Sequence, residues 1–301
     1  ILFFPLWNLN HKERITSRMN FSFKDFFAPS GTFPPAGIFS RFHFIMLALA
    51  AVIITVALLI FRHAKPKTVK IQIRFFALFL CTLEVIKIIF NLRTGHGSDP
   101  NSYMPLYFCS IAMYAGLLAG FAKGFWKRVG EVFLATGGIV GGLAYLIYPL
   151  TSLTIYPPIH FISFHSFAYH SVMVYLGLLL LITHYVQLKP EDVDKHVLLI
   201  TGVSLIAYFF NLIFHSNLMF ISQNYPGTFL DVIYKIFPGY SFSIVMVLGQ
   251  ALGPFYLVYL FWWLLHRKKR GAAAPAEESG EACDPLQDMA TVNPANTQSK
   301  D

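Results

Sequence analysis

Long runs of apolar residues, separated by short polar loops, alternate along most of this chain. A hydrocarbon layer roughly 30 Å thick is crossed by about 20 apolar residues of helix, and seven of the runs are near that length. We expect membrane-spanning helices at residues 43–61, 72–91, 104–122, 131–150, 167–186, 197–214 and 242–265. The pattern therefore predicts an all-α, polytopic membrane protein with seven transmembrane helices.

Composition supports this prediction. Hydrophobic residues make up 55% of the 301 residues and charged residues only 13%, which is too apolar for a soluble domain. The net charge of +8 does not indicate a nucleic-acid partner, because its basic residues lie in short loops beside the predicted helices. The cysteines, Cys81, Cys109 and Cys283, lie in two helices and a tail, so no disulfide framework is expected.

The same pattern divides the chain into three regions. We expect an N-terminal arm at 1–41, a seven-helix transmembrane domain at 42–266, and a basic stop with a disordered cytoplasmic tail at 267–301. Residues 1–18 differ in composition from the rest of the arm, and Met19 is a plausible start, so we expect this prefix not to be native.

Basic residues predict the orientation of the bundle. The N-terminus is expected outside or in a lumen and the C-terminus in the cytoplasm, because cytoplasmic loops are enriched in lysine and arginine. The intervening loops hold only Arg93 and Lys235. The expected cytoplasmic segments hold fourteen: Arg62, Lys65, Lys67, Lys70, Arg74, Lys123, Lys127, Arg128, Lys189, Lys195, Arg267, Lys268, Lys269 and Arg270.

A few polar residues interrupt the apolar runs, and in this orientation all lie in the outer half of the membrane. Polar groups inside a membrane are costly and are usually retained for function. Glu84 and Lys87, three residues apart on one helix, are predicted to form an ion pair, either to stabilise the bundle or to serve a substrate.

The remaining polar residues of this level carry candidate chemistry. Cys109, expected about two turns into its helix, and His170, one turn into another, are a candidate nucleophile and base, although each alone is commonly structural. Asn211 and Asn217 supply amide donors suited to a carbonyl or a lipid headgroup.

Other chemistries fit the sequence less well. A retinal protein needs a lysine within 242–265, and this segment has none. The histidines of the outer loops lack the spacing of a zinc site, so no metal and no cofactor is expected. The glycines of TGGIVGG at 136–142 predict close helix packing.

Several motifs, in order, resemble the YwaF and transmembrane-protein-164 family of integral membrane proteins. They are LEVIKII at 83–89, MPLYFCSI at 104–111, YPL at 148–150, YHSVMVY at 169–175 and NLMFI at 217–221. The resemblance covers roughly residues 25–265. Many family members carry a histidine close to the cysteine, whereas Tyr107 and Ser110 lie near it here.

The resemblance implies a function for these residues. In the vertebrate member, a cysteine and a histidine matching Cys109 and His170 are proposed to transfer phospholipid acyl chains, beside a Glu-x-x-Lys matching Glu84 and Lys87. The expected function is thus a phospholipid acyltransferase or acyl hydrolase, with membrane lipids as partners. The alternative is a non-enzymatic lipid- or solute-binding or transport protein. The expected location is the plasma membrane in a bacterium, or an endomembrane in a eukaryote.

Overall fold

The computed structural model describes residues 23–271, and all regular secondary structure within them is helical. By internal contacts the chain divides into two units, residues 1–261 and 262–301. The helix α11 (Tyr240–Gly271) continues into the second unit. The prefix 1–18 and nearly all of the predicted disordered tail lie outside the described residues, so these two predictions stay untested.

Six helical segments within residues 23–271 are long and apolar enough to cross a membrane. They correspond to six of the seven predicted helices. Their bounds are α1 (Arg41–Phe61), α2 (Pro66–Arg93), α5 to α6 (Gly124–Ile147, with a π-helical turn at Leu134–Gly138), α8 (Phe161–Ile182), α9 (Val193–Phe214) and α11.

The predicted helix at 104–122 is wrong in its first part. The chain forms the single turn α3 (Pro100–Tyr103), then non-helical backbone, and only then α4 (Ile111–Phe121). Pro105 explains the break, because proline disfavours helical backbone in the residue before it, and Met104 is extended. With 11 residues, α4 is roughly 16 Å long at ~1.5 Å per residue, about half of the hydrocarbon layer.

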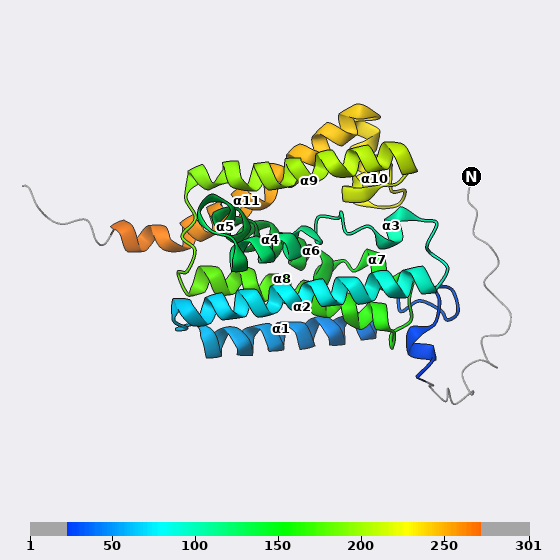
Figure 1. Cartoon of the computed structure of the whole chain (residues 1–301), viewed down its shortest axis with the longest axis horizontal. Coiled ribbons are helices and arrows are strands. Elements are labelled where there is room, and N and C mark those ends of the chain that lie inside the picture. Colours follow the sequence, from blue (N-terminus) through cyan, green and yellow to red (C-terminus); the bar gives the residue numbers. More distant parts are fainter. Residues whose placement is uncertain (1–22, 272–301) are drawn as a thin grey trace, which may run out of the picture. The chain divides into compact units, whose positions relative to one another are not determined.

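Two helical segments form the centre of the bundle. Buried residues make up 72% of the apolar window of Gly124–Ile147 and 67% of that of α8, against 17–28% in the other four spans. α1, α2 and α6 pack against α8, while α4 packs against α2 and α5 (Figure 1). The outer helices expose apolar side chains, as helices that face lipid do.

Glycines let the two central segments approach closely. A Cβ atom on Gly142 would lie 2.9 Å from the carbonyl oxygen of His170, and one on Gly177 would lie 2.5 Å from that of Leu134. Larger residues would push α6 and α8 apart, which confirms the packing interpretation of the glycine-rich segment. This contact fixes the backbone of α8 at His170.

The loops meet in two groups, one at each end of the bundle. At the end nearer the N-terminal arm, Ser30 Oγ lies 3.1 Å from His96 Nε2, and His160 Nε2 donates to the carbonyl of Ala28 over 3.0 Å. At the opposite, basic end, Arg128 forms an ion pair with Asp192 at 2.5 Å. The grouping agrees with the loops that the charge pattern assigns to each side.

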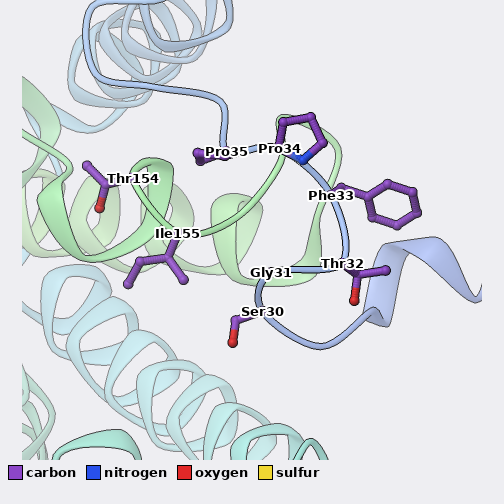
Figure 2. A pocket seen from close by; sticks show the side chains of 8 residues that line it. All are labelled: Ser30, Gly31, Thr32, Phe33, Pro34, Pro35, Thr154 and Ile155. Atoms are coloured by element: carbon purple, nitrogen blue, oxygen red, sulfur yellow. The ribbon is translucent and has the colours of Figure 1, made fainter. Parts of the chain in front are cut away.

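A surface hollow of about 620 Å³ lies at the arm end. The loop 30–35 and the residues Thr154 and Ile155, which follow the short helix α7 (Leu150–Leu153), line it (Figure 2). None of the predicted site residues belongs to its lining. The candidate chemistry lies instead among the side chains between α2, α4 and α8.

Candidate functional site

Glu84 and Lys87 form the predicted ion pair on α2. The Lys87 Nζ and Glu84 Oε1 atoms are 2.6 Å apart, and the side chains are 21% and 4% exposed. The carboxylate therefore lies inside the bundle while the ammonium keeps partial access to its surface. Both charges act on the Cys109 sulfur electrostatically, so the pair belongs to the same region as the candidate nucleophile.

Cys109 lies in the turn just before α4, not within a helix as predicted. Because α4 starts late, the backbone of Cys109 and Ser110 lies outside the helix, at its N-terminal end. The adjacent Phe108 fixes the turn against α6, since a Cβ on Gly141 would meet the Phe108 ring at 2.8 Å. Cys109 is a free cysteine, and as a residue it is half-buried. Thiolates are stabilised at such helix starts and beside cations.

His170 is held in one tautomer. Its Nδ1 lies 2.7 Å from the carbonyl oxygen of Ser166, which can only accept, so Nδ1 carries the proton. In the neutral imidazole Nε2 then carries the lone pair, and the hydrogen bond that His170 makes within the described residues uses only Nδ1. The imidazole stacks on the Tyr145 ring, with centroids 3.7 Å apart and planes 12° from parallel. The arrangement presents a fixed, neutral base.

Shared neighbours place Cys109 and His170 in one region. Lys87 acts electrostatically on both, and the Tyr145 side chain that stacks on His170 is within electrostatic range of Cys109. Within the described residues, no hydrogen bond joins the thiol to the imidazole. Catalytic hydrogen bonds are often long before substrate binds, so this geometry is compatible with a pair that closes on substrate.

Asn211 has a different environment. Its amide nitrogen donates to Leu218 O over 3.0 Å and to Ser222 Oγ over 2.7 Å. Its amide oxygen accepts from Leu218 N–H and Ser216 Oγ–H, each over 2.8 Å. Each polar atom of this buried side chain thus has partners in the loop that follows α9. A direct role of Asn211 at a substrate stays a prediction.

Asn217 links this loop to the segment that carries Cys109. Its backbone N–H donates to Asn101 Oδ1 over 2.7 Å, and Tyr107 donates its hydroxyl hydrogen to Asn101 O over 3.0 Å. The Asn217 side-chain oxygen accepts from the N–H groups of Ser222 and Gln223, each over 3.0 Å. Asn217 supports the position of the Cys109 turn through Asn101 and Tyr107; contact with a substrate stays a prediction.

Comparison with known proteins places this bundle in a family. The TMEM164 family model matches residues 38–265. The chain belongs to the TMEM164 family. No curated protein and no solved structure shows significant similarity to it. The matched range includes all six predicted site residues, and with its apolar helices this family member is an integral, multi-pass membrane protein.

Sequence reasoning missed two polar groups of this site in the TMEM164-family chain. Tyr169 is 2% exposed, and its hydroxyl has no hydrogen-bond partner among the described residues. His165 donates from Nε2 to Leu83 O over 3.0 Å, which leaves its buried Nδ1 without a partner. In the sequence both look like ordinary aromatic residues of an apolar helix. The adjacency of Tyr169 to His170 was the one available signal.

The arrangement of possible metal-ligating side chains bears on the prediction that no metal is bound. Across residues 23–265, no three side chains of His, Cys, Asp or Glu gather closely enough to hold a metal ion. The described site contains a thiol, an imidazole, a phenol and an ion pair.

Proposed function

We propose that this TMEM164-family protein is a membrane-embedded phospholipid acyltransferase or acyl hydrolase that uses Cys109 as nucleophile and His170 as general base. The single observation that carries the proposal is the tautomer of His170. Its Nδ1–H is bound to Ser166 O, so the unprotonated Nε2 of a buried, stacked imidazole is available to take a proton. The family resemblance supports the same pair.

The reaction has two halves. In the first, the Cys109 thiol gives its proton to His170 Nε2 while sulfur forms a bond to the ester carbonyl carbon. The carbonyl electrons move to oxygen and return as the C–O ester bond breaks, and His170 gives the proton to the departing lysophospholipid hydroxyl. In the second, an alcohol or water gives its proton to His170 and attacks the thioester, and the thiol of Cys109 is regenerated.

The surroundings of Cys109 act on a thiolate in both directions. Removing a thiol from water disfavours its charged form, so a buried nucleophile needs compensating groups. The ammonium of Lys87 is one such group, while the carboxylate of Glu84 acts against the thiolate. Glu84 also holds the Lys87 ammonium in place at 2.6 Å. The reacting groups lie among apolar helices, which suits esters of membrane lipids.

The orientation completes the proposal. We propose that the arm end, and with it the site, faces outward or into a lumen, because the basic end carries the charge excess. The exposed residues Thr154 and Glu191 mark opposite ends. In a cysteine-free background, an impermeant thiol reagent added outside should label Thr154→Cys and not Glu191→Cys. Labelling of Thr154→Cys only from the cytoplasmic side would contradict the orientation.

Release or transfer of labelled fatty acid from phospholipid vesicles by the purified protein tests the activity. Wild type should turn over, and Cys109→Ala should not, whereas the matched Cys81→Ala should resemble wild type. Full turnover by Cys109→Ala would show that the nucleophile is another group. No turnover by wild type on several phospholipid classes would favour the non-enzymatic lipid-binding alternative.

A further inference from the structure

The Tyr169 hydroxyl is a buried hydrogen-bond donor that has no acceptor among the described residues. Its side chain is 2% exposed, and the hydroxyl has no partner among the described residues. Leaving such a group unpaired is costly, so native proteins rarely keep one without a use or a bound molecule. The packing of α8 does not require the hydroxyl, because a phenylalanine ring would fill the same space.

The position of Tyr169 connects it to the reacting groups. Its ring contacts that of His170, with centroids 5.7 Å apart and planes at 58°, and it stacks loosely on His165 at 5.9 Å. The hydroxyl is within electrostatic range of both Cys109 and Glu84. A donor therefore lies against the candidate base and within electrostatic range of the nucleophile, and it is hydrogen-bonded to neither.

The hydroxyl groups of the other tyrosines near the site already take part in hydrogen bonds. Tyr114 donates its hydroxyl hydrogen to Pro105 O over 3.1 Å. Tyr145 shares a hydrogen bond with Ser152, and Tyr107 donates to Asn101. Attack of a thiolate on an ester generates a negative oxygen that needs a donor already in place. Asn211 Nδ2 donates both of its hydrogens within its loop, and Asn217 Nδ2 donates to Gln223 O, so of the phenols named here Tyr169 alone has an unused hydroxyl hydrogen.

We propose that Tyr169 is a catalytic residue that donates its hydroxyl hydrogen bond to the substrate carbonyl oxygen as Cys109 attacks, and so stabilises the oxyanion. The inference rests on the proposed acyl-transfer function and deepens it. When sulfur bonds to the carbonyl carbon, the electron pair moves to that oxygen, which accepts from Tyr169; the pair returns when the ester bond breaks. The phenol keeps its proton throughout.

Tyr169→Phe removes only the oxygen and keeps the ring. We expect it to slow acylation of Cys109 by a phospholipid ester about 10²- to 10³-fold, the usual effect of losing one oxyanion donor. Alkylation of Cys109 by iodoacetamide forms no oxyanion and should keep its wild-type rate. Tyr175→Phe, on the same helix but bonded to Gln72, is the matched control and should change neither rate.

The outcomes separate this inference from the proposed function. Wild-type turnover with an unchanged rate in Tyr169→Phe would overturn the role of Tyr169 and leave the Cys109–His170 pair intact. Parallel losses of acylation and alkylation in the variant would assign Tyr169 a structural role and overturn the inference. No acylation in wild type, with alkylation intact, would overturn both proposals.

A spectroscopic measurement checks the contact itself. The infrared carbonyl stretch of a ¹³C-labelled thioester on Cys109 should lie at lower frequency in wild type than in Tyr169→Phe, because a hydrogen bond weakens the carbonyl double bond. The comparison needs a single acylation and no turnover. An identical frequency in the two proteins would show that the hydroxyl does not reach this oxygen.

Discussion

Two buried polar regions of the bundle use their hydrogen-bonding capacity in opposite ways. In the first, the asparagine network of Asn211, Asn217 and Asn101, each side-chain amide has partners in the protein. In the second, the core site of Cys109, His170, Tyr169, Glu84 and Lys87, the buried Tyr169 hydroxyl has no partner among the described residues, and the hydrogen bond of His170 uses only Nδ1. The amides of the first region are hydrogen-bonded within the protein, while the second region has polar groups that can still form hydrogen bonds to a further molecule.

This difference in hydrogen bonding indicates that polar groups inside a membrane protein can serve two purposes, stability and activity. Side-chain amides with hydrogen-bond partners stabilise the conformation of a loop. This loop needs such stabilisation, because Met219 and Phe220 have positive φ angles of 58° and 54°. Unsatisfied groups reduce stability and persist where a ligand or a reaction uses them. Variants of the asparagine network should therefore lower stability, and variants of Cys109, His170 and Tyr169 should lower activity.

The largest effect is expected at the nucleophile. Cys109→Ser should lower turnover about a thousandfold or more, because an alkoxide is much harder to form than a thiolate. His170→Ala should lower it by a similar factor, and the double variant should lose little beyond either single one, since the two act as a unit. Initial rates of fatty-acid release measure this. If the loss of turnover in the double variant were the product of the two single losses, Cys109 and His170 would have independent roles.

The ion pair should show the next largest effect. Glu84→Gln leaves Lys87 without a countercharge and should lower stability by about 3 kcal/mol, because a largely buried charge loses its partner. Thermal unfolding in detergent measures the change. Adding Lys87→Met to Glu84→Gln should restore most of the stability. Unchanged unfolding in the single variant would show that lipid headgroups or water satisfy Lys87.

The asparagine network should respond in stability and not in chemistry. Asn211→Ala removes the partners of Leu218 N–H and Ser216, and should cost about 2 kcal/mol. Asn224, which makes one hydrogen bond of 2.8 Å to Asp231, offers the matched control, and Asn224→Ala should cost clearly less. Turnover per folded molecule should stay near wild type in both. Abolished turnover in folded Asn211→Ala would assign the amide to the core site.

The smallest effect concerns pH at the arm end. Burial lowers the pKa of His160 below its ordinary value of 6.5, despite the hydrogen bond to Ala28 that opposes this. The unfolded chain thus takes up a proton near pH 6.5 and the folded chain only at lower pH. Stability is complete above pH 6.5 and declines as pH falls from there toward the folded-state pKa.

Protonation of His160 also removes the Nδ1 lone pair that accepts from Ile162 N–H over 3.1 Å. Hydrogen exchange at Ala36 and Gly37, whose N–H groups bind Tyr156 O and Leu153 O, should therefore quicken modestly between pH 6.5 and 5, beyond the intrinsic pH dependence of exchange. His160→Asn keeps a capping oxygen and should lose this extra pH dependence. The same response in His160→Asn would trace it to another group.

Hydrophobic pattern was sufficient to predict most of the helices, because about twenty apolar residues leave few alternatives. It failed at residues 104–110, where Pro105 ends helical backbone inside an apolar run, and that failure moved Cys109 from a helix to a turn. It also missed α10 (Phe229–Ile236), a short helix within the predicted outer loop, since eight residues give little periodicity. Local backbone preferences decided both cases.

The sequence was sufficient to predict the ion pair of the site but not the hydrogen bonds of its side chains. The spacing of Glu84 and Lys87 fixed their ion pair, because residues three apart share a helix face. The tautomer of His170 rests on the backbone carbonyl of Ser166, one turn earlier in the same helix, and residue types do not reveal such a contact. The occupied amide of Asn211 and the free hydroxyl of Tyr169 depend on segments outside their own helices. No spacing rule within one helix contains that information.

The most direct test of the central claim is to look for a covalent intermediate on Cys109. The purified protein is mixed with a phospholipid whose acyl chain carries a heavy isotope, quenched within seconds, digested and examined by mass spectrometry. We predict a hydroxylamine-sensitive acyl group on the Cys109 peptide, absent from Cys109→Ala and accumulating more slowly in His170→Ala. A labelled acyl group on Cys81 alone, or none on any cysteine while fatty acid is released, would contradict the claim that Cys109 is the nucleophile.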